Sequence, residues 1–336
     1  MNPIPTMQDV ARLAGVSTKT VSNVINDRPY VSAETRDRVH AAIAQLDYKL
    51  NLAARNLRSG RSGVIGLAVP TLTVAYFAEL AEAVIDAAEQ HQLAVQIART
   101  GDAAREREFL ASARLQHVDG LILSPMDHRS EELEAVDLSV PTVVLGDHPV
   151  GGAAVYVSSD QRGAAQLATS HLIRIGCRRI AALGARSSVP GGAGALRLQG
   201  YRDALHTAGI PYDAGLVVEA DVWDRADGAS AMHQLIERGA AFDSVFAFND
   251  SLALGAMRTL EDNGLRVPGD VSVIGIDNVT EARYSVPSLT TVDLGGSKIA
   301  ETAVRLLAEQ LSNPESAPEH RVLIDFALVE RESTAH

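Results

Sequence analysis

An α/β protein is expected from the sequence, with a short helical headpiece followed by a larger body built on two parallel sheets. In residues 1–47, apolar side chains recur at helical spacing in three short segments. From Val64 onward, short apolar runs alternate with helical stretches, the pattern of parallel strands covered by helices on both faces. Roughly nine or ten strands in about 270 residues suit two such sheets better than one.

Three short helices are expected in the headpiece, each begun by a hydroxyl side chain that can accept a hydrogen bond from the helix N-terminus. Thr6, Ser17 and Ser32 are these caps, and Gly15 allows the left-handed conformation that ends the first helix. The expected inward positions are Val10, Leu13 and Ala14 in the first helix, Val21, Val24 and Ile25 in the second, and Val39, Ile43 and Leu46 in the third.

A helix, a glycine-containing turn and a second helix with polar outward side chains form a helix-turn-helix, whose second helix lies in the major groove of DNA. Residues 1–62 contain nine basic and five acidic residues, although the whole chain has a net charge of −12. A positive headpiece on an acidic body suits a protein that touches a polyanion only through the headpiece. A three-helix packing without DNA is the alternative, and the hydroxyl side chains and basic linker favour DNA.

In the body, nine apolar runs are expected as strands and amphipathic stretches between them as helices. The expected strands are 64–70, 94–98, 120–125, 142–146, 154–157, 179–184, 244–248, 271–276 and 289–292. Helices are expected between most of them, for example at 76–91, 160–175, 196–208 and 251–264. Residues 51–61 are a weakly amphipathic segment too short for a stable isolated helix, so we expect a linker that orders with a partner.

Composition limits the classes of protein that remain. Hydrophobic residues make up 46% of the 336 and charged residues 21%, and no apolar run approaches the roughly 18 residues that a membrane span needs. The N-terminal segment has no secretory-signal pattern, so a cytoplasmic protein is expected. The single cysteine, Cys177, cannot form an internal disulfide and is expected to be an inert thiol.

No motif predicts catalysis. The glycine-rich stretch 191–194 follows an expected strand, but its spacing is neither that of a dinucleotide-binding turn nor that of a P-loop. Nucleophile-elbow and zinc-protease motifs are absent as well. Surface loops explain Asp127, His128 and His148 better than a metal site does. We therefore expect no catalytic residue, no cofactor and no metal.

Residues 6–26 read TMQDVARLAGVSTKTVSNVIN, and this string closely resembles the headpiece of the LacI/GalR family of bacterial transcription regulators. The resemblance continues through residues 51–60 into the body. Landmarks in family order are Asp160-Gln161-Arg162-Gly163-Ala164, His171-Leu172, Arg197 with Gly200-Tyr201, Asn249-Asp250, Gly275-Ile276-Asp277 and Leu289-Thr290-Thr291-Val292.

The resemblance implies a periplasmic-binding-protein-like body of two doubly wound parallel-sheet subdomains with a ligand cleft between them. It places the headpiece at 1–48, a hinge helix or linker at 49–61 and the body at 62–336. By analogy the chain crosses between subdomains near residues 161, 290 and 321. The N-subdomain is then about 62–161 with 291–321, and the C-subdomain about 162–290 with 322–336.

For DNA contacts, the resemblance places Thr18, Lys19 and Asn23 where family members read base edges. Many relatives carry arginine at the position of Asn23, so adenine or a phosphate replaces guanine as its expected partner. Leu57 matches the hinge leucine that wedges into the minor groove, with Arg58 as the adjacent basic position, and a buried linker leucine is the alternative. The other residues expected at the DNA are Thr6, Ser17, Thr20, Ser22 and Asn51.

For ligand contacts, the resemblance implies seven positions in the body: Tyr76, Phe77, Asp147, Arg197, Trp223, Asn249 and Asp277. This set suits a polyol, because a carboxylate accepts from adjacent hydroxyls, a guanidinium donates as a fork and an aromatic face packs on ring carbons. The alternatives are a salt bridge for Arg197, a core position for Trp223, and a core or dimer surface for Tyr76 and Phe77.

The expected protein is therefore a homodimeric, cytoplasmic transcription regulator, associated with the nucleoid when bound to a palindromic operator. A small ligand, a sugar or glycoside first and a purine or nucleoside second, is expected to change its operator affinity. Two rival hypotheses are a cytosolic or secreted sugar-binding protein and a sugar-processing or dinucleotide enzyme, because the fold by itself is compatible with both. The chain shows no terminal leucine heptad, so a tetramer made that way is not expected.

Overall fold

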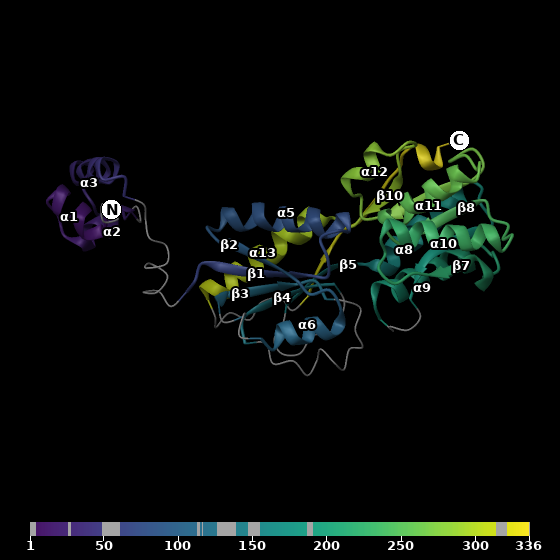
Figure 1. Ribbon diagram of the computed structural model, residues 1–336, viewed down its shortest axis with the longest axis horizontal. Coiled ribbons are helices and arrows are strands. Elements are labelled where there is room, and N and C mark those ends of the chain that lie inside the picture. Colours follow the sequence, from purple (N-terminus) through teal and green to yellow (C-terminus); the bar gives the residue numbers. More distant parts are fainter. Residues whose placement is uncertain are drawn as a thin grey trace. The chain divides into compact units, whose positions relative to one another are not determined.

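The computed structural model describes residues 5–25, 28–48, 61–112, 115, 117–125, 139–146, 155–186, 191–313 and 321–335. The chain divides into two compact units, Met1–Ser62 and Gly63–His336, which we call the headpiece and the body. Both are drawn in Figure 1. None of the helices in the described ranges combines the length and the apolar character that a membrane span requires.

The headpiece contains α1 (Met7–Ala14), α2 (Thr18–Ile25) and α3 (Ala33–Gln45). Thr6 and Asp9 form a capping box in which each side chain accepts a hydrogen bond from the other residue's backbone N–H. The αL conformation of Gly15, with φ of 65°, ends α1, and Ser32 caps α3. The buried core consists of Val10, Ala11, Ala14, Val21, Val24, Val39 and Ala42.

One inward position expected in α1 is wrong. Leu13 is 46% exposed, and Ala11 is buried instead. Successive helical residues turn by about 100°, so the face formed by Val10, Ala11 and Ala14 is centred about 100° away from Leu13. The small side chains of Ala11 and Ala14 let α1 pack closely, while Leu13 stays at the surface.

The body contains two six-stranded sheets with the same winding. The strands are β1 (Val64–Val69), β2 (Ala94–Arg99), β3 (Gly120–Leu123), β4 (Thr142–Leu145), β5 (Val155–Ser159), β6 (Ile180–Ala185), β7 (Val217–Glu219), β8 (Ser244–Ala247), β9 (Ser272–Ile276), β10 (Thr290–Asp293), β11 (Arg321–Ile324) and β12 (Ala327–Val329). One sheet has the order β11-β5-β4-β3-β1-β2 and the other β12-β10-β9-β8-β6-β7. We call the half of the body built on the first of these sheets lobe 1 and the half built on the second lobe 2. Only the β10–β12 pairing among the described strands is antiparallel.

Helices lie against both sheets (Figure 1). They are α5 (Ala75–Gln90), α6 (Ala103–Leu110), α8 (Gln161–Arg174), α9 (Ala193–Thr207), α10 (Arg225–Glu237), α11 (Asp250–Asp262), α12 (Thr280–Tyr284) and α13 (Gly296–Ser312), with short 3-10 turns at Ala214–Leu216 and Glu332–Thr334. The strands and the four helices expected from the sequence form within a few residues of the expected bounds. β7, β11 and β12, which are only three or four residues long, were not expected.

The first crossover lies between β5 and α8, near residue 161 as the resemblance implies, and the other two lie a few residues later than implied. The crossovers expected near residues 290 and 321 fall at the starts of β10 and β11. β10 pairs with β9 and β12 and so belongs to lobe 2 up to Asp293, whereas β11 pairs with β5 and belongs to lobe 1 up to Ile324. The chain therefore passes to the other lobe only after the last paired residue of each strand.

Two crossovers are joined by a buried hydrogen bond. Ser159, at the end of β5, donates from Oγ to the backbone oxygen of Leu294, at a distance of 2.6 Å. Leu294 directly follows β10, so the first and second crossovers are held side by side. This bond therefore ties together two of the three segments that connect the lobes.

Candidate functional site

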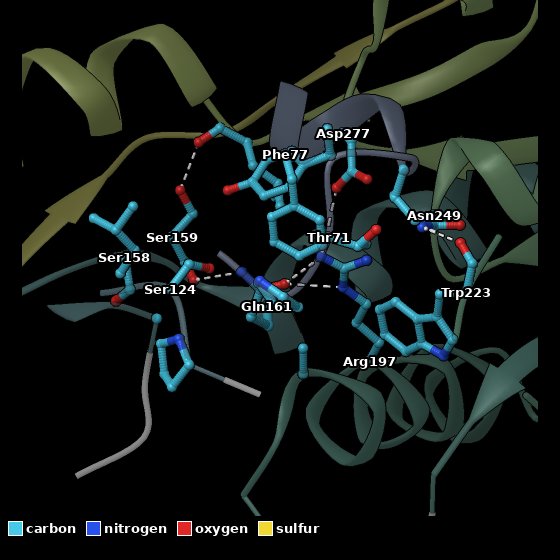
Figure 2. A pocket seen from close by; sticks show the side chains of 18 of the residues that line it. Thr71, Phe77, Ser124, Ser158, Ser159, Gln161, Arg197, Trp223, Asn249 and Asp277 are labelled. Atoms are coloured by element: carbon cyan, nitrogen blue, oxygen red, sulfur yellow. Dashed lines mark hydrogen bonds and ion pairs between the residues drawn. The ribbon is translucent and has the colours of Figure 1, made fainter. Parts of the chain in front are cut away.

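A cavity of about 270 Å³ lies in the body and is lined by residues of both lobes (Figure 2). In each sheet the strand order reverses beside β1 or β6, which is the topological switch point where doubly wound sheets bind ligands. Among the cavity-lining residues, Thr71, Ser124, Arg186, Asn249 and Asp277 follow the carboxyl ends of β1, β3, β6, β8 and β9. The fold therefore predicts a ligand site at the position where the cavity is found.

Arg197, on α9, is 5% exposed and lines this cavity. Its Nε and Nη2 atoms both donate to Gln161 Oε1, at 2.9 and 2.7 Å. A further donor, Nη1, contacts the backbone oxygen of Phe248, and Nη2 lies 3.7 Å from Asp277 Oδ1. The guanidinium is thus held by a side-chain amide, a carbonyl and a carboxylate.

Asp277 follows β9 and adopts a left-handed backbone conformation with φ of 119°. The pKa of its carboxyl is raised to about 7: burial is the largest cause, Arg197 lowers the pKa, and Glu79 and Asp293 raise it. The group therefore changes charge close to neutral pH. This makes it a hydrogen-bond acceptor whose strength depends on pH.

Asn249 is the N-cap of α11, where its Oδ1 accepts from the backbone N–H of Leu252 at 2.8 Å. Its Nδ2 donates to the backbone oxygen of Trp223 at 2.9 Å and so fixes the loop before α10. Trp223 has a positive φ of 64°, and its ring lies 5.6 and 5.2 Å from the guanidinium carbons of Arg186 and Arg197. Asn249 therefore shapes the cavity wall as well as facing it.

Tyr76 and Phe77 lie in the first turn of α5 and bring aromatic rings to the cavity from lobe 1. Their ring centroids are 5.3 Å apart in an edge-to-face arrangement. Burial raises the pKa of Tyr76, so its hydroxyl stays protonated and can donate. Figure 2 shows Phe77 among the labelled side chains that line the cavity with Arg197 and Asp277.

Six of the seven residues expected at a ligand site line this one cavity, and Asp147 lies outside the described residues. The sequence interpretation missed further lining side chains, among them Thr71, Ser124, Ser159, Gln161 and Arg186. Their common signal is position, because each stands at or just after the end of a strand. Gln161 stood out in the sequence only as part of a family landmark.

In the headpiece, Thr18 and Lys19 are exposed at the start of α2. Ser17 accepts from the backbone N–H of Thr20 at 3.1 Å, as expected of a helix cap. Asn23 Oδ1 lies 3.4 Å from the donating hydroxyl of Tyr30, a 72% exposed aromatic residue that the sequence interpretation did not single out.

Of the other residues expected at the DNA, the structure describes Thr6 and Ser22. Thr6 donates its hydroxyl to Asp9 Oδ2 at 2.6 Å as part of the cap of α1, and Ser22 lies on α2. Asn51, Leu57 and Arg58 lie outside the described residues.

A three-helix headpiece and a two-lobed body with a ligand-sized cavity define a DNA-binding regulator that responds to a small molecule. Comparison with known families agrees: residues 6–51 match bacterial regulatory proteins of the lacI family, and residues 169–334 match the periplasmic binding protein-like domain. The chain belongs to the lacI family of bacterial regulatory proteins.

Individual relatives span almost the whole chain. The HTH-type transcriptional regulator CelR of Thermobifida fusca is 36% identical over 98% of this chain and 98% of its own length. The solved complex of CelR with cellobiose has 34% identity and a TM-score of 0.72, over 98% of this chain and 99% of that one. A lac repressor dimer bound to operator and an anti-inducer has 31% identity and a TM-score of 0.82, over 99% and 100%.

Family membership confirms three expectations from the sequence. The chain is a sequence-specific DNA-binding transcription regulator, it has the α/β architecture of the lac repressor, and it is not an enzyme.

Proposed function

We propose that the body cavity binds a sugar or glycoside and that this effector changes the affinity of the headpiece for its operator. The observation that carries the proposal is the buried pair of Arg197 and Asp277, 3.7 Å apart inside a cavity that also presents Phe77 and Trp223. Adjacent hydroxyls can donate to the carboxylate and accept from the guanidinium, while ring carbons pack on the aromatic faces. The cellobiose complex of a relative 34% identical supports this choice.

A purine or nucleoside is the second candidate, because Tyr76, Phe77 and Trp223 all face the cavity. A planar base gains most when parallel rings cover both of its faces, whereas sugar ring carbons need only one aromatic face. The rings of Tyr76 and Phe77 meet at 71° and so cannot both lie parallel to one base. This arrangement favours a polyhydroxyl ligand over a planar base.

A second proposal concerns the contacts of the headpiece with DNA. We propose that Thr18, Lys19 and Asn23 contact base edges, that Thr6, Ser17, Thr20, Ser22, Asn51 and Arg58 contact or position the backbone, and that Leu57 wedges into the minor groove. Two copies are needed to read the halves of a palindromic operator, so the working form is a homodimer. A relative forms such a dimer on its operator. The working location is the cytoplasm, at the nucleoid when bound to operator.

The effector proposal is tested by titration calorimetry with cellobiose, glucose, adenine and hypoxanthine, followed by operator binding across a titration of whichever compound binds. The expected result is saturable binding of a sugar and a change of operator affinity of about 5- to 150-fold. If only a base binds, the second candidate is correct. If no compound changes operator affinity, the cavity does not have the proposed regulatory role.

The DNA proposal is tested by selecting binding sites from random duplexes. We expect a palindrome centred on a pyrimidine–purine step, CG being the expected step, because a wedge needs a step that unstacks easily. Leu57→Ala should lose specific affinity, whereas Lys19→Ala should change the preferred bases of each half-site. Normal binding of Leu57→Ala to the selected site would refute the wedge.

A further inference from the structure

We propose that Gln161 is an internal competitor for the effector: its amide oxygen occupies the fork of Arg197 in the ligand-free protein and leaves when the effector binds. The inference rests on the proposed function, since it assumes that an effector uses Arg197. It adds a role for a residue whose side chain lies in the cavity wall and whose backbone lies at a crossover between the lobes.

The geometry of the contact is that of a bound ligand. Gln161 Oε1 accepts from Arg197 Nε at 2.9 Å and from Nη2 at 2.7 Å, so one oxygen engages the edge of the guanidinium that a hydroxyl pair or carboxylate would use. Nη1 is committed to the backbone oxygen of Phe248, the residue directly after β8. The edge held by Gln161 is therefore the edge that an effector in the cavity must compete for (Figure 2).

The rest of the Gln161 side chain is weakly held. Its Nε2 lies 3.4 Å from the backbone oxygen of Ser159, at the long limit of a hydrogen bond, and the residue is only half-buried. Arg197, in contrast, is 5% exposed and its charge needs an acceptor in every state of the protein. A side-chain rotation of Gln161 can thus release the fork only when another acceptor arrives.

The position of Gln161 links this exchange to movement of the lobes. It is the first residue of α8, directly after the crossover from β5. Ser159, two residues earlier, donates to the backbone oxygen of Leu294 at 2.6 Å and so joins the first crossover to the second. Release of Gln161 changes the packing at these linked crossovers, which is where one lobe rotates on the other.

The test compares Gln161→Ala, which removes the competitor, with Gln161→Glu, which strengthens it by a buried ion pair with Arg197. Calorimetry with the sugar that wild type binds should show about tenfold tighter binding to Gln161→Ala and at least about tenfold weaker binding to Gln161→Glu. The matched control is Gln199→Ala on α9, where the exposed amide bonds Asp203 at 2.9 Å and should leave the affinity unchanged. If both Gln161 variants bind more weakly, Gln161 is an effector contact and the inference is wrong.

A second measurement needs no sugar. The Arg197 Nε–H should exchange slowly in wild type and in Gln199→Ala, and faster in Gln161→Ala, when followed by nitrogen-15 NMR. Gln161→Met, which keeps the length of the side chain without the amide, replaces Gln161→Ala if the latter does not fold. Unchanged exchange would overturn the inference whatever the sugar does, while failure of wild type to bind any of the tested compounds would count against the proposed function alone.

Discussion

The two lobes of the body share one strand order but bring different chemistry to the cavity. Lobe 2 supplies four charged lining side chains, Arg186, Arg197, Asp221 and Asp277, whereas the described lining residues of lobe 1 carry none. Lobe 1 instead supplies aromatic rings and hydroxyls. From this difference we expect the fixed charges on lobe 2 to orient the effector first and the neutral wall of lobe 1 to close on it afterwards.

The largest effect is expected from Arg197→Ala. It removes the fork and leaves Asp277 and the effector hydroxyls without their charged partner, so effector affinity should fall by at least about 100-fold. Operator binding without effector should survive. Arg202→Ala is the matched control, because this arginine lies on the same helix but contacts Tyr212, with 3.0 Å between Nη2 and the hydroxyl. Effector affinity is measured by calorimetry. Equal losses of affinity in the two variants would show that the charged side chains of lobe 2 do not orient the effector.

The next effect is a pH dependence that belongs to lobe 2. The folded-state pKa of Asp277 is about 7, above the usual value of about 3.9, so the carboxyl ionises across neutral pH. An effector that donates hydroxyls to the carboxylate binds the ionised form, and its affinity should rise about tenfold from pH 6 to pH 8. Asp277→Asn should abolish this rise. Calorimetry in two buffers of different ionisation enthalpy measures the proton released on binding.

The same carboxyl affects stability in the opposite direction. Because the folded state holds the proton more tightly than the unfolded state, the contribution of Asp277 to stability is complete below about pH 4 and is lost as the pH rises through 7. Denaturant unfolding across this range should show a steeper decline in wild type than in Asp277→Asn, where the buried carboxyl of Asp250, whose pKa is also raised by burial, still contributes. The difference in unfolding free energy between wild type and variant removes the contribution of the other titrating groups. If this difference does not change with pH, the carboxyl of Asp277 is not desolvated.

The fold could be predicted from the sequence because alternating apolar runs and helical stretches are a local signal repeated nine times. The missed strands lack that signal: β7 has three residues, and β11 and β12 have exposed or half-buried side chains. Their pairing is determined by neighbours far away in the sequence, such as β5 for β11. Leu13 fails for a related reason, since only the packed helices show which side of α1 faces inward.

The residues of the site could be predicted from the sequence, but their partners could not. Arg197, Asn249 and Asp277 stand at family landmarks, and all three line the cavity. The bond from Asn249 to the backbone of Trp223 and the hold of Gln161 on Arg197 join residues that are 26 and 36 positions apart in the sequence. Such pairings arise only when the fold of lobe 2 brings these segments together, so no spacing in the sequence indicates them.

A smaller effect is expected on the side of lobe 1. Phe77→Ala removes an aromatic face from the cavity without touching a charge, and it should weaken effector binding about fivefold. Phe77→Leu, which keeps apolar area, should recover part of the loss. Calorimetry at pH 8, where Asp277 is mostly ionised, separates this contribution from that of lobe 2. A loss as large as that of Arg197→Ala would mean that the lobes share the binding energy evenly.

The smallest effect is expected from Ser124→Ala, which removes a hydroxyl from the neutral wall. Ser124 follows β3 and is 8% exposed, so the change fits the space and leaves the backbone bond from Ser124 N to Ala68 O, at 2.9 Å, in place. One hydrogen bond between neutral groups contributes about 1 kcal/mol, so the effector affinity should fall by no more than about fivefold. The operator response should keep its full amplitude and shift only in effector concentration, because closure of lobe 1 still occurs. If the change of operator affinity is lost even at saturating effector, the hydroxyl of lobe 1 drives closure. The expected order, in which the charges of lobe 2 act first, would then be wrong.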